Sequence, residues 1–76
     1  MLNVMRKVVE GKKYRHFKGD IITVKCLAFD SETLREQVVY EHNGKLWVRD
    51  MEMFLSKVDK NKYPDVLQVY RFEEIC

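Results

Sequence analysis

Two apolar runs flank a two-residue turn in the middle of the chain. Residues 38–42 and 45–49 are rich in β-branched and aromatic side chains, and Asn43-Gly44 lies between them. Asn-Gly between such runs is the strongest short-range signal for a β-hairpin with a type I′ turn, in which both turn residues have positive φ. The sequence therefore predicts a hairpin that reverses at Asn43-Gly44.

The short turn also determines which side chains face one another across the hairpin. In this register Tyr40 faces Trp47, and Val39 faces Val48. Successive side chains of a strand point to opposite faces, so one face is aliphatic and the other, which includes Arg49, is aromatic and basic. We expect the aliphatic face to point into the core. The aromatic side chains then either line a groove or are themselves core, because a small barrel can cover both faces of a bent strand.

Residues 21–29 are the best candidate for the central strand. The stretch is rich in β-branched residues, and Ile22, Val24, Cys26 and Ala28 form an apolar face of period two. Together with the aliphatic face of the hairpin, this strand predicts a single core. Its expected members are Ile22, Val24, Cys26, Val39, Val48 and Phe54.

The remaining segments complete a small β-rich domain. Residues 13–17 alternate as a short strand, and residues 66–72 have the pattern of a final strand. Residues 51–58 carry apolar side chains at helical spacing behind a good N-cap, which predicts one short helix. Residues 30–36 contain a capping box, but they run directly into the hairpin, and we interpret them as a loop and the start of a strand. The pattern predicts an all-β fold, a small antiparallel β-barrel of four to five short strands with one short helix.

The size of the chain, 76 residues, predicts a single domain. We divide it into an N-terminal extension, 1–12, and a barrel, 13–75. Residues 6–7 are charged where a signal peptide would need its apolar core, and no run approaches the roughly 20 apolar residues of a membrane span. Cys26 lies in an apolar run and Cys76 at the end of the chain, which is no disulfide framework. We therefore expect a cytoplasmic protein with no membrane contact.

A set of short motifs follows in order along the chain. They are Tyr14-Arg15-His16-Phe17-Lys18-Gly19, Ser31-Glu32-Thr33, Val38-Val39-Tyr40, Leu46-Trp47-Val48-Arg49, Met53-Phe54 and Arg71-Phe72-Glu73. As a set they resemble a small bacterial family of uncharacterised domains, from about Tyr14 to Ile75. The resemblance implies an all-β barrel of the Src-homology-3 type, and it implies no activity. The chain differs from the family at Asp50 and Tyr70, where the family tends to have Pro.

No motif for catalysis or metal binding stands out. A nucleophile needs a base within hydrogen-bond reach and an oriented oxyanion site, and Ser31 with a distant His is no such trio. His16, His42 and the two cysteines lack the paired spacings of a zinc site. Cys26 lies on the apolar face of the predicted central strand, and we expect it to be buried and inert. We expect neither an enzyme nor a cofactor.

Charge is distributed unevenly along the chain. The net charge is +2, yet residues 1–18 hold six basic residues against Glu10 alone. Such a segment is either a solvated basic surface or a contact for nucleic acid or an acidic partner. Arginine and aromatic side chains together suit phosphates, stacked bases or a peptide. The candidate ligand-binding residues are Arg15, His16, Lys18, Tyr40, Trp47 and Arg49.

Two classes of binding function remain open. The modest net charge and the grooves between the loops of a small barrel favour a protein or peptide ligand. The basic and aromatic segment 12–18 favours nucleic acid, against the acidic residues elsewhere in the chain. We expect a non-catalytic binding module for a protein or peptide, with nucleic acid as the alternative ligand, acting as a monomer or a weak homodimer.

Overall fold

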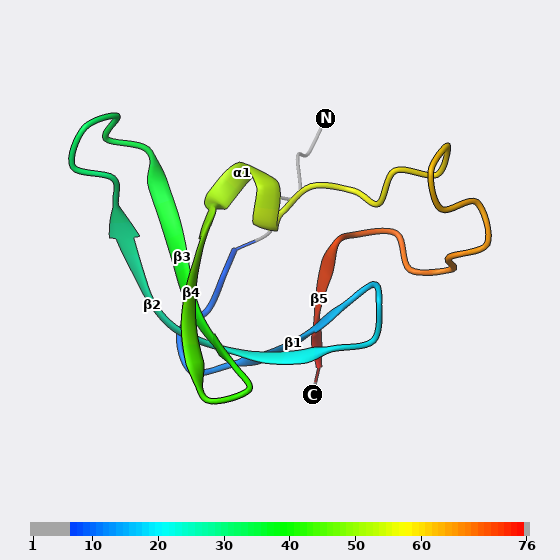
Figure 1. The fold of residues 1–76 in the computed structure, drawn as a ribbon, viewed down its shortest axis with the longest axis horizontal. Coiled ribbons are helices and arrows are strands. Elements are labelled where there is room, and N and C mark those ends of the chain that lie inside the picture. Colours follow the sequence, from blue (N-terminus) through cyan, green and yellow to red (C-terminus); the bar gives the residue numbers. More distant parts are fainter. Residues whose placement is uncertain (1–6, 76) are drawn as a thin grey trace.

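A computed structural model of the protein describes residues 7–75. The elements follow one another as β1 (Lys13–His16), β2 (Ile21–Phe29), β3 (Glu36–His42), β4 (Lys45–Asp50), α1 (Met51–Phe54) and β5 (Phe72–Ile75). Five strands form one unclosed antiparallel sheet in the order β4-β3-β2-β1-β5, so β2 is the central strand, as expected (Figure 1). The predicted all-β fold with one short helix is confirmed. Within residues 7–75, no helix has the length and hydrophobicity needed to span a bilayer.

The β3–β4 hairpin has the predicted turn and register. Asn43 has a φ of 54° and Gly44 a φ of 76°, both in the left-handed region. Tyr40 pairs with Trp47, and Val39 pairs with Val48. The short-range signal of Asn-Gly is therefore sufficient to define this part of the fold.

The inward face of the hairpin is the opposite of the predicted one. Val38 and Tyr40 are buried, whereas the Val48 side chain is 62% exposed. Tyr40 pairs with buried Val24 of β2, and side chains that pair across two strands share one face of the sheet. The aromatic face of the hairpin is thus the one that reaches the core.

A β-bulge in β2 explains why Cys26 is exposed instead of buried. Val24 pairs with Tyr40 but Cys26 pairs with Val39, so Lys25 is an extra residue in the ladder. One extra residue shifts the alternation by one position, and Cys26 therefore lies on the outer face beside Val39. The predicted burial of Cys26 is wrong, whereas Ile22 and Val24, before the bulge, are core as expected.

The core is mainly aromatic and gathers against α1. Phe54 of α1 is fully buried and stacks on Phe72 of β5, with ring centroids 4.2 Å apart and an interplanar angle of 3°. Tyr14 meets Phe54 edge to face at 5.4 Å, and Tyr40 lies 5.9 Å from Phe72. In Figure 1, α1 lies between the β3–β4 hairpin and β5. The inward position predicted for Phe54 is confirmed.

The helix is shorter than the predicted 51–58. The hydroxyl and the backbone N–H of Ser56 both donate to the Met53 carbonyl oxygen, at 2.6 and 3.2 Å, and the helix ends at Phe54. Val58 is buried nonetheless, and its N–H donates to the carbonyl of Val69. Val58 thus lies in a strand-like contact with Val69, and the helix does not continue for a second turn.

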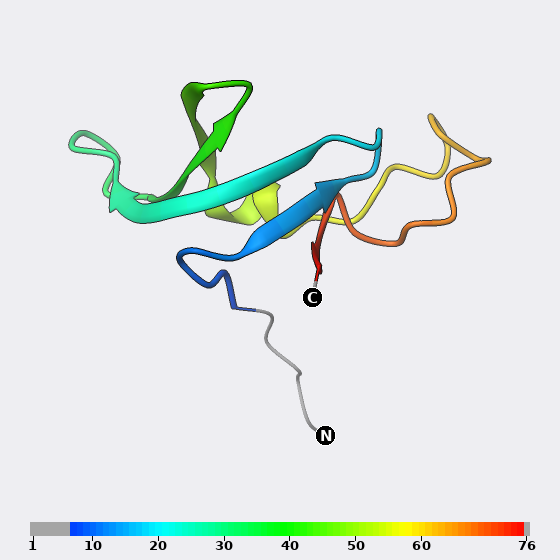
Figure 2. The ribbon, with the colours of Figure 1, turned by 90° about the horizontal axis from the view of Figure 1, so that it is seen from below.

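The predicted final strand 66–72 is also wrong. Residues 55–71 form a loop that extends away from the sheet beside β5 (Figure 2), and Leu67 within it is 96% exposed. β5 begins at Phe72, which pairs with His16 of β1. Phe72 is also the residue that stacks on Phe54 in the core.

The described part of the N-terminal extension packs on the sheet. Val8 contacts the core, and the Val9 N–H donates to the Tyr14 hydroxyl at 3.0 Å. A Glu10 carboxylate oxygen accepts the N–H of Leu27 at 3.1 Å. Leu2, Val4 and Met5 of the same extension lie outside the described residues.

Candidate functional site

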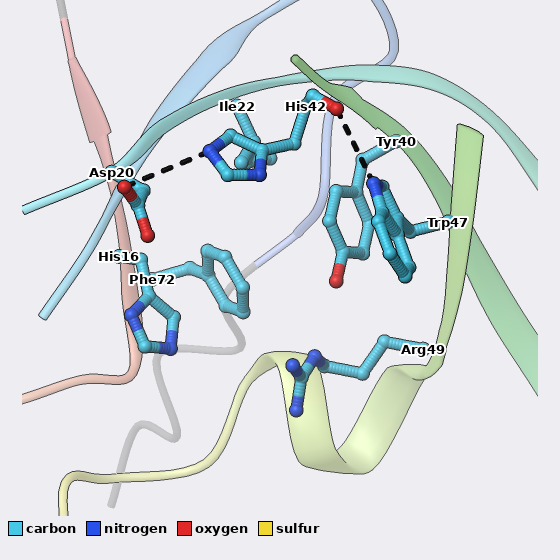
Figure 3. Close-up of a pocket in the computed structure, with 8 residues that line it drawn as sticks. All are labelled: His16, Asp20, Ile22, Tyr40, His42, Trp47, Arg49 and Phe72. Carbon is cyan, nitrogen blue, oxygen red and sulfur yellow. Dashed lines mark hydrogen bonds and ion pairs between the residues drawn. The ribbon is translucent and has the colours of Figure 1, made fainter. Parts of the chain in front are cut away.

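An open cleft lies where the aromatic face of the hairpin meets β1 and β5 (Figure 3). We name it the aromatic cleft, and its volume is about 270 Å³. Apolar walls come from Ile22, Tyr40, Trp47 and Phe72, and polar groups come from His16, Asp20, His42 and Arg49. All of these residues lie on strands of the sheet except Asp20, which lies in the turn before β2.

Trp47 and Tyr40 have different places in this cleft. Tyr40 is largely buried in the core, whereas the Trp47 side chain remains 47% exposed at the rim. The indole Nε1–H of Trp47 donates to the carbonyl oxygen of His42 at 3.3 Å, which holds the ring against the hairpin. Of the two alternatives, core or groove, Tyr40 belongs mainly to the core and Trp47 to the groove.

Arg49 lies at the lower end of the cleft in Figure 3. Its guanidinium carbon is 5.5 Å from the centroid of the Phe72 ring. Its Nε is buried and has no hydrogen-bond partner among the described residues. A buried donor without a partner costs free energy.

His16 stands between Arg49 and the turn that follows β1. Its pKa is lowered, first by partial burial and then by the positive charges of Arg49 and Arg71. The backbone N–H of Lys18 donates to its Nδ1 at 3.2 Å, a contact that requires an unprotonated Nδ1. His16 is therefore held in its neutral form as an imidazole beside the cleft.

The opposite end of the cleft carries a carboxylate. An oxygen of Asp20 lies 3.6 Å from Nε2 of His42 (Figure 3). Arg49 and Asp20 thus give the aromatic cleft one basic and one acidic end. Within residues 7–75, no group of three His, Cys, Asp or Glu side chains could hold a metal ion.

A second cleft adjoins the first, and we name it the basic cleft. It has a volume of about 320 Å³ and shares His16 and Arg49 with the aromatic cleft. Its other walls come from the β1–β2 turn and the 55–71 loop, and they consist of Phe17, Lys18, Asp59, Lys62, Tyr63 and Arg71. Four cationic side chains and one carboxylate therefore line the basic cleft.

The family to which the chain belongs follows from a comparison of its sequence with known families. Residues 12–74 match the family described as "Protein of unknown function (DUF1653)". The chain is a member of this family. The DUF1653 match includes every residue of both clefts and confirms the expected resemblance to an uncharacterised family. Comparisons with curated proteins and with solved structures found no significant match.

The DUF1653 fold brings together most of the residues predicted to bind a ligand. Tyr40 and Trp47 line the aromatic cleft, Lys18 lines the basic cleft, and His16 and Arg49 line both. Arg15 is not with them, because it alternates with buried Tyr14 in β1 and points to the other face of the sheet.

Several residues of the two clefts were not predicted. His42 shares a hairpin face with Tyr40 in period two, so the pattern contained its signal. Lys62, Tyr63 and Arg71 come from the loop whose path the sequence pattern did not predict, and no local signal distinguishes them from other loop residues. Their place in the basic cleft depends on tertiary packing.

Proposed function

We propose that this member of the DUF1653 family is a non-catalytic binding module that docks a protein or peptide segment in the aromatic cleft. The observation that supports this function best is the half-exposed indole of Trp47 at the rim of a cleft that Arg49 also lines. Rigid aromatic and arginine side chains in partly desolvated pockets dominate the energetics of protein recognition.

The size of the aromatic cleft supports a side chain as its occupant. Its volume of about 270 Å³ is below the roughly 300–1,000 Å³ typical of small-molecule sites. One large apolar side chain packs between Trp47 and Phe72. A backbone carbonyl or a carboxylate of the same segment then accepts a hydrogen bond from Arg49. A carboxylate accepts the stronger bond, because both partners are charged.

The test is selection of peptides from a random array, followed by titration of the selected peptide. Trp47 is the only tryptophan of the chain, so its fluorescence reports on this cleft alone. We expect Trp47→Ala to weaken binding about 30-fold or more, the loss of roughly 2 kcal/mol that defines a hot spot, while the domain stays folded. Binding of the variant is measured by calorimetry.

Leu46→Ala is the matched control for this experiment. Leu46 is the neighbouring exposed residue of β4 and points to the opposite face of the sheet. Equal loss of binding in both variants, or no peptide selected by the wild-type protein, would refute the proposed site.

Nucleic acid is the second candidate ligand, and the basic cleft is the observation that favours it. A nucleic acid must bind with a steep dependence on salt, because each neutralised phosphate releases counterions. Titration with single-stranded and duplex oligonucleotides from low to physiological salt tests this, with Lys18→Ala expected to flatten the slope. Under the peptide hypothesis we expect at most weak binding of oligonucleotides, without the steep salt dependence of several neutralised phosphates.

A further inference from the structure

The basic cleft gathers cations that have no anionic partner within residues 7–75. Lys18, Arg49, Lys62 and Arg71 line it, and none of them forms an ion pair within residues 7–75. Asp59 is the acidic residue of this lining, and one of its carboxylate oxygens already accepts the N–H of Asn61 at 3.0 Å. The cleft therefore carries an excess of positive charge that would attract an anion.

Aromatic rings and hydrogen bonds position these cations. The Lys18 Nζ lies 5.8 Å from the centroid of the Phe17 ring and 5.5 Å from that of Tyr63. The Nε of Arg71 donates to the Ser56 hydroxyl at 3.1 Å, which leaves the other N–H groups of its guanidinium for a ligand. A preorganised arginine with nearby lysines is the usual means of binding a phosphoryl group, which has three strong acceptor oxygens.

We propose that the basic cleft binds the phosphoryl group of a phosphorylated side chain, in the same peptide whose neighbouring apolar side chain occupies the aromatic cleft. This inference rests on the proposed function, because the two clefts adjoin and share His16 and Arg49 in their walls. Arg49 reaches both clefts and contacts both parts of the ligand.

The arrangement of charge favours one phosphoryl group over a nucleic acid strand. A strand needs cations along its whole track, but the space next to the basic cleft is the aromatic cleft, with Asp20 at its far end. The carboxylate of Asp20 would repel a second phosphate there. A single dianion beside an apolar group fits both clefts.

The first experiment uses inorganic phosphate as the probe and NMR amide shifts as the readout. At constant ionic strength, we expect saturable shifts at Lys18, Lys62 and Tyr63 with phosphate and none with chloride. We also expect the pKa of His16 to rise, because a bound anion offsets the positive charges of Arg49 and Arg71 that now lower it.

Matched charge variants test whether the basic cleft is responsible. Lys18→Gln and Arg71→Gln should each weaken phosphate binding tenfold or more, whereas Lys12→Gln, an exposed lysine that lines neither cleft, should leave it unchanged. Thermal melts identify any variant that fails to fold, and the two cleft variants then serve as independent tests. Equal binding by all three variants would overturn the phosphate site.

The second experiment separates the sources of the phosphoryl group. A degenerate peptide pool with a central phosphoserine is compared with the same pool carrying serine or glutamate, and with oligothymidine. We expect the phosphoserine pool to bind at least tenfold better than either peptide pool. The peptide ligand would be overturned in favour of nucleic acid if oligothymidine displaced the phosphoserine pool and its affinity fell with salt as expected for several neutralised phosphates.

Failure of this inference is distinguishable from failure of the proposed function. Peptides selected through Trp47 with no preference for phosphoserine would overturn the phosphate site and leave the binding module intact. Phosphate binding to the basic cleft without selection of any peptide would overturn the phosphopeptide ligand together with the proposed function.

Discussion

At the scale of single residues, burial and charge separate positions that look equivalent in the sequence. Val38 and Val48 both lie in the hairpin, but Val38 is fully buried and Val48 is largely exposed. His16 and His42 both line the aromatic cleft, yet partial burial and the charges of Arg49 and Arg71 lower the pKa of His16, whereas His42 lies 3.6 Å from a carboxylate oxygen of Asp20. The surroundings of each side chain, and not its type, therefore determine what its substitution changes.

Substitution of the two valines tests the inward face of the hairpin. Val38→Ala should lower the free energy of unfolding by about 2 kcal/mol, because it removes two buried methyl groups and leaves a cavity. Val48→Ala should change it by less than about 0.5 kcal/mol, as for other exposed positions. Denaturant titrations measure both. A larger loss for Val48→Ala would show that the aliphatic face is the inner one after all.

The lowered pKa of His16 predicts a dependence of stability on pH. The unfolded histidine keeps its ordinary pKa of 6.5 and the folded one is lower, so the unfolded state binds more protons as the pH falls. This contribution to stability is present above the unfolded pKa and is lost as the pH falls through the folded value. Partial burial, Arg49, Arg71 and Lys18 oppose protonation, and Asp20 favours it.

Denaturant titrations of His16→Asn check this dependence. The wild-type protein should lose stability as the pH falls below the unfolded pKa of 6.5, and the variant should lose less over the same range. His42→Asn is the control, because it removes the other histidine of the cleft and leaves His16 in place. A pH dependence unchanged in His16→Asn would assign the titration to other groups.

At the scale of elements, one turn and one β-bulge set the geometry of the sheet. The Asn43-Gly44 turn fixes the register of the hairpin, and the bulge at Lys25 shifts the alternation of β2 against β3. α1 then covers the inner face with Phe54, and Asp50 caps its first turn by accepting the N–H of Glu52 at 3.0 Å. Turn and bulge together orient Trp47 and Arg49 toward the clefts.

The turn can be tested at Gly44. Its φ of 76° is unfavourable for residues with a Cβ, and an added Cβ there would meet no atom within 4 Å. Gly44→Ala should therefore cost about 1–2 kcal/mol from backbone conformation alone. Asn43→Gly is the control and should cost less, since glycine adopts positive φ readily. Chemical denaturation measures both, and equal costs would argue against the left-handed turn.

At the scale of the whole molecule, the two ends of the open sheet meet through aromatic stacking. α1 contacts β3 and β4, and Phe54 stacks on Phe72 of β5, at the other end of the strand order. The aromatic cleft has walls from both sides of this junction. The site and the core therefore depend on the same contact.

Phe54→Ala should unfold much of the protein. Loss of a buried phenylalanine costs about 3–5 kcal/mol, a large fraction of the roughly 5–15 kcal/mol that stabilises a typical protein. Met53→Ala is the control, because Met53 is the exposed neighbour in the same helix. Circular dichroism melts compare the two. A midpoint for Phe54→Ala close to that of Met53→Ala would show that α1 does not join the two ends.

Local signals in the sequence were enough for the elements whose geometry depends on neighbouring residues. The hairpin register, the central strand and the inward position of Phe54 follow from turn chemistry and periodicity. For the same reason three of the six candidate residues, those of the hairpin, line one cleft together, and His16, which pairs with Phe72 of β5, lines it with them. Residues a few positions apart are held in one geometry by the backbone itself.

Only the tertiary structure decided the rest. The extra residue Lys25, which reverses the exposure of Cys26, depends on how β2 pairs with β3. Phe72, the first residue of β5, completes the core beside Phe54. No pattern within residues 66–72 predicts this contact or the start of the strand. The basic cleft joins Lys18 to Arg71 across most of the chain. Such contacts form between segments far apart in sequence, where packing, and not local preference, sets which side chains meet.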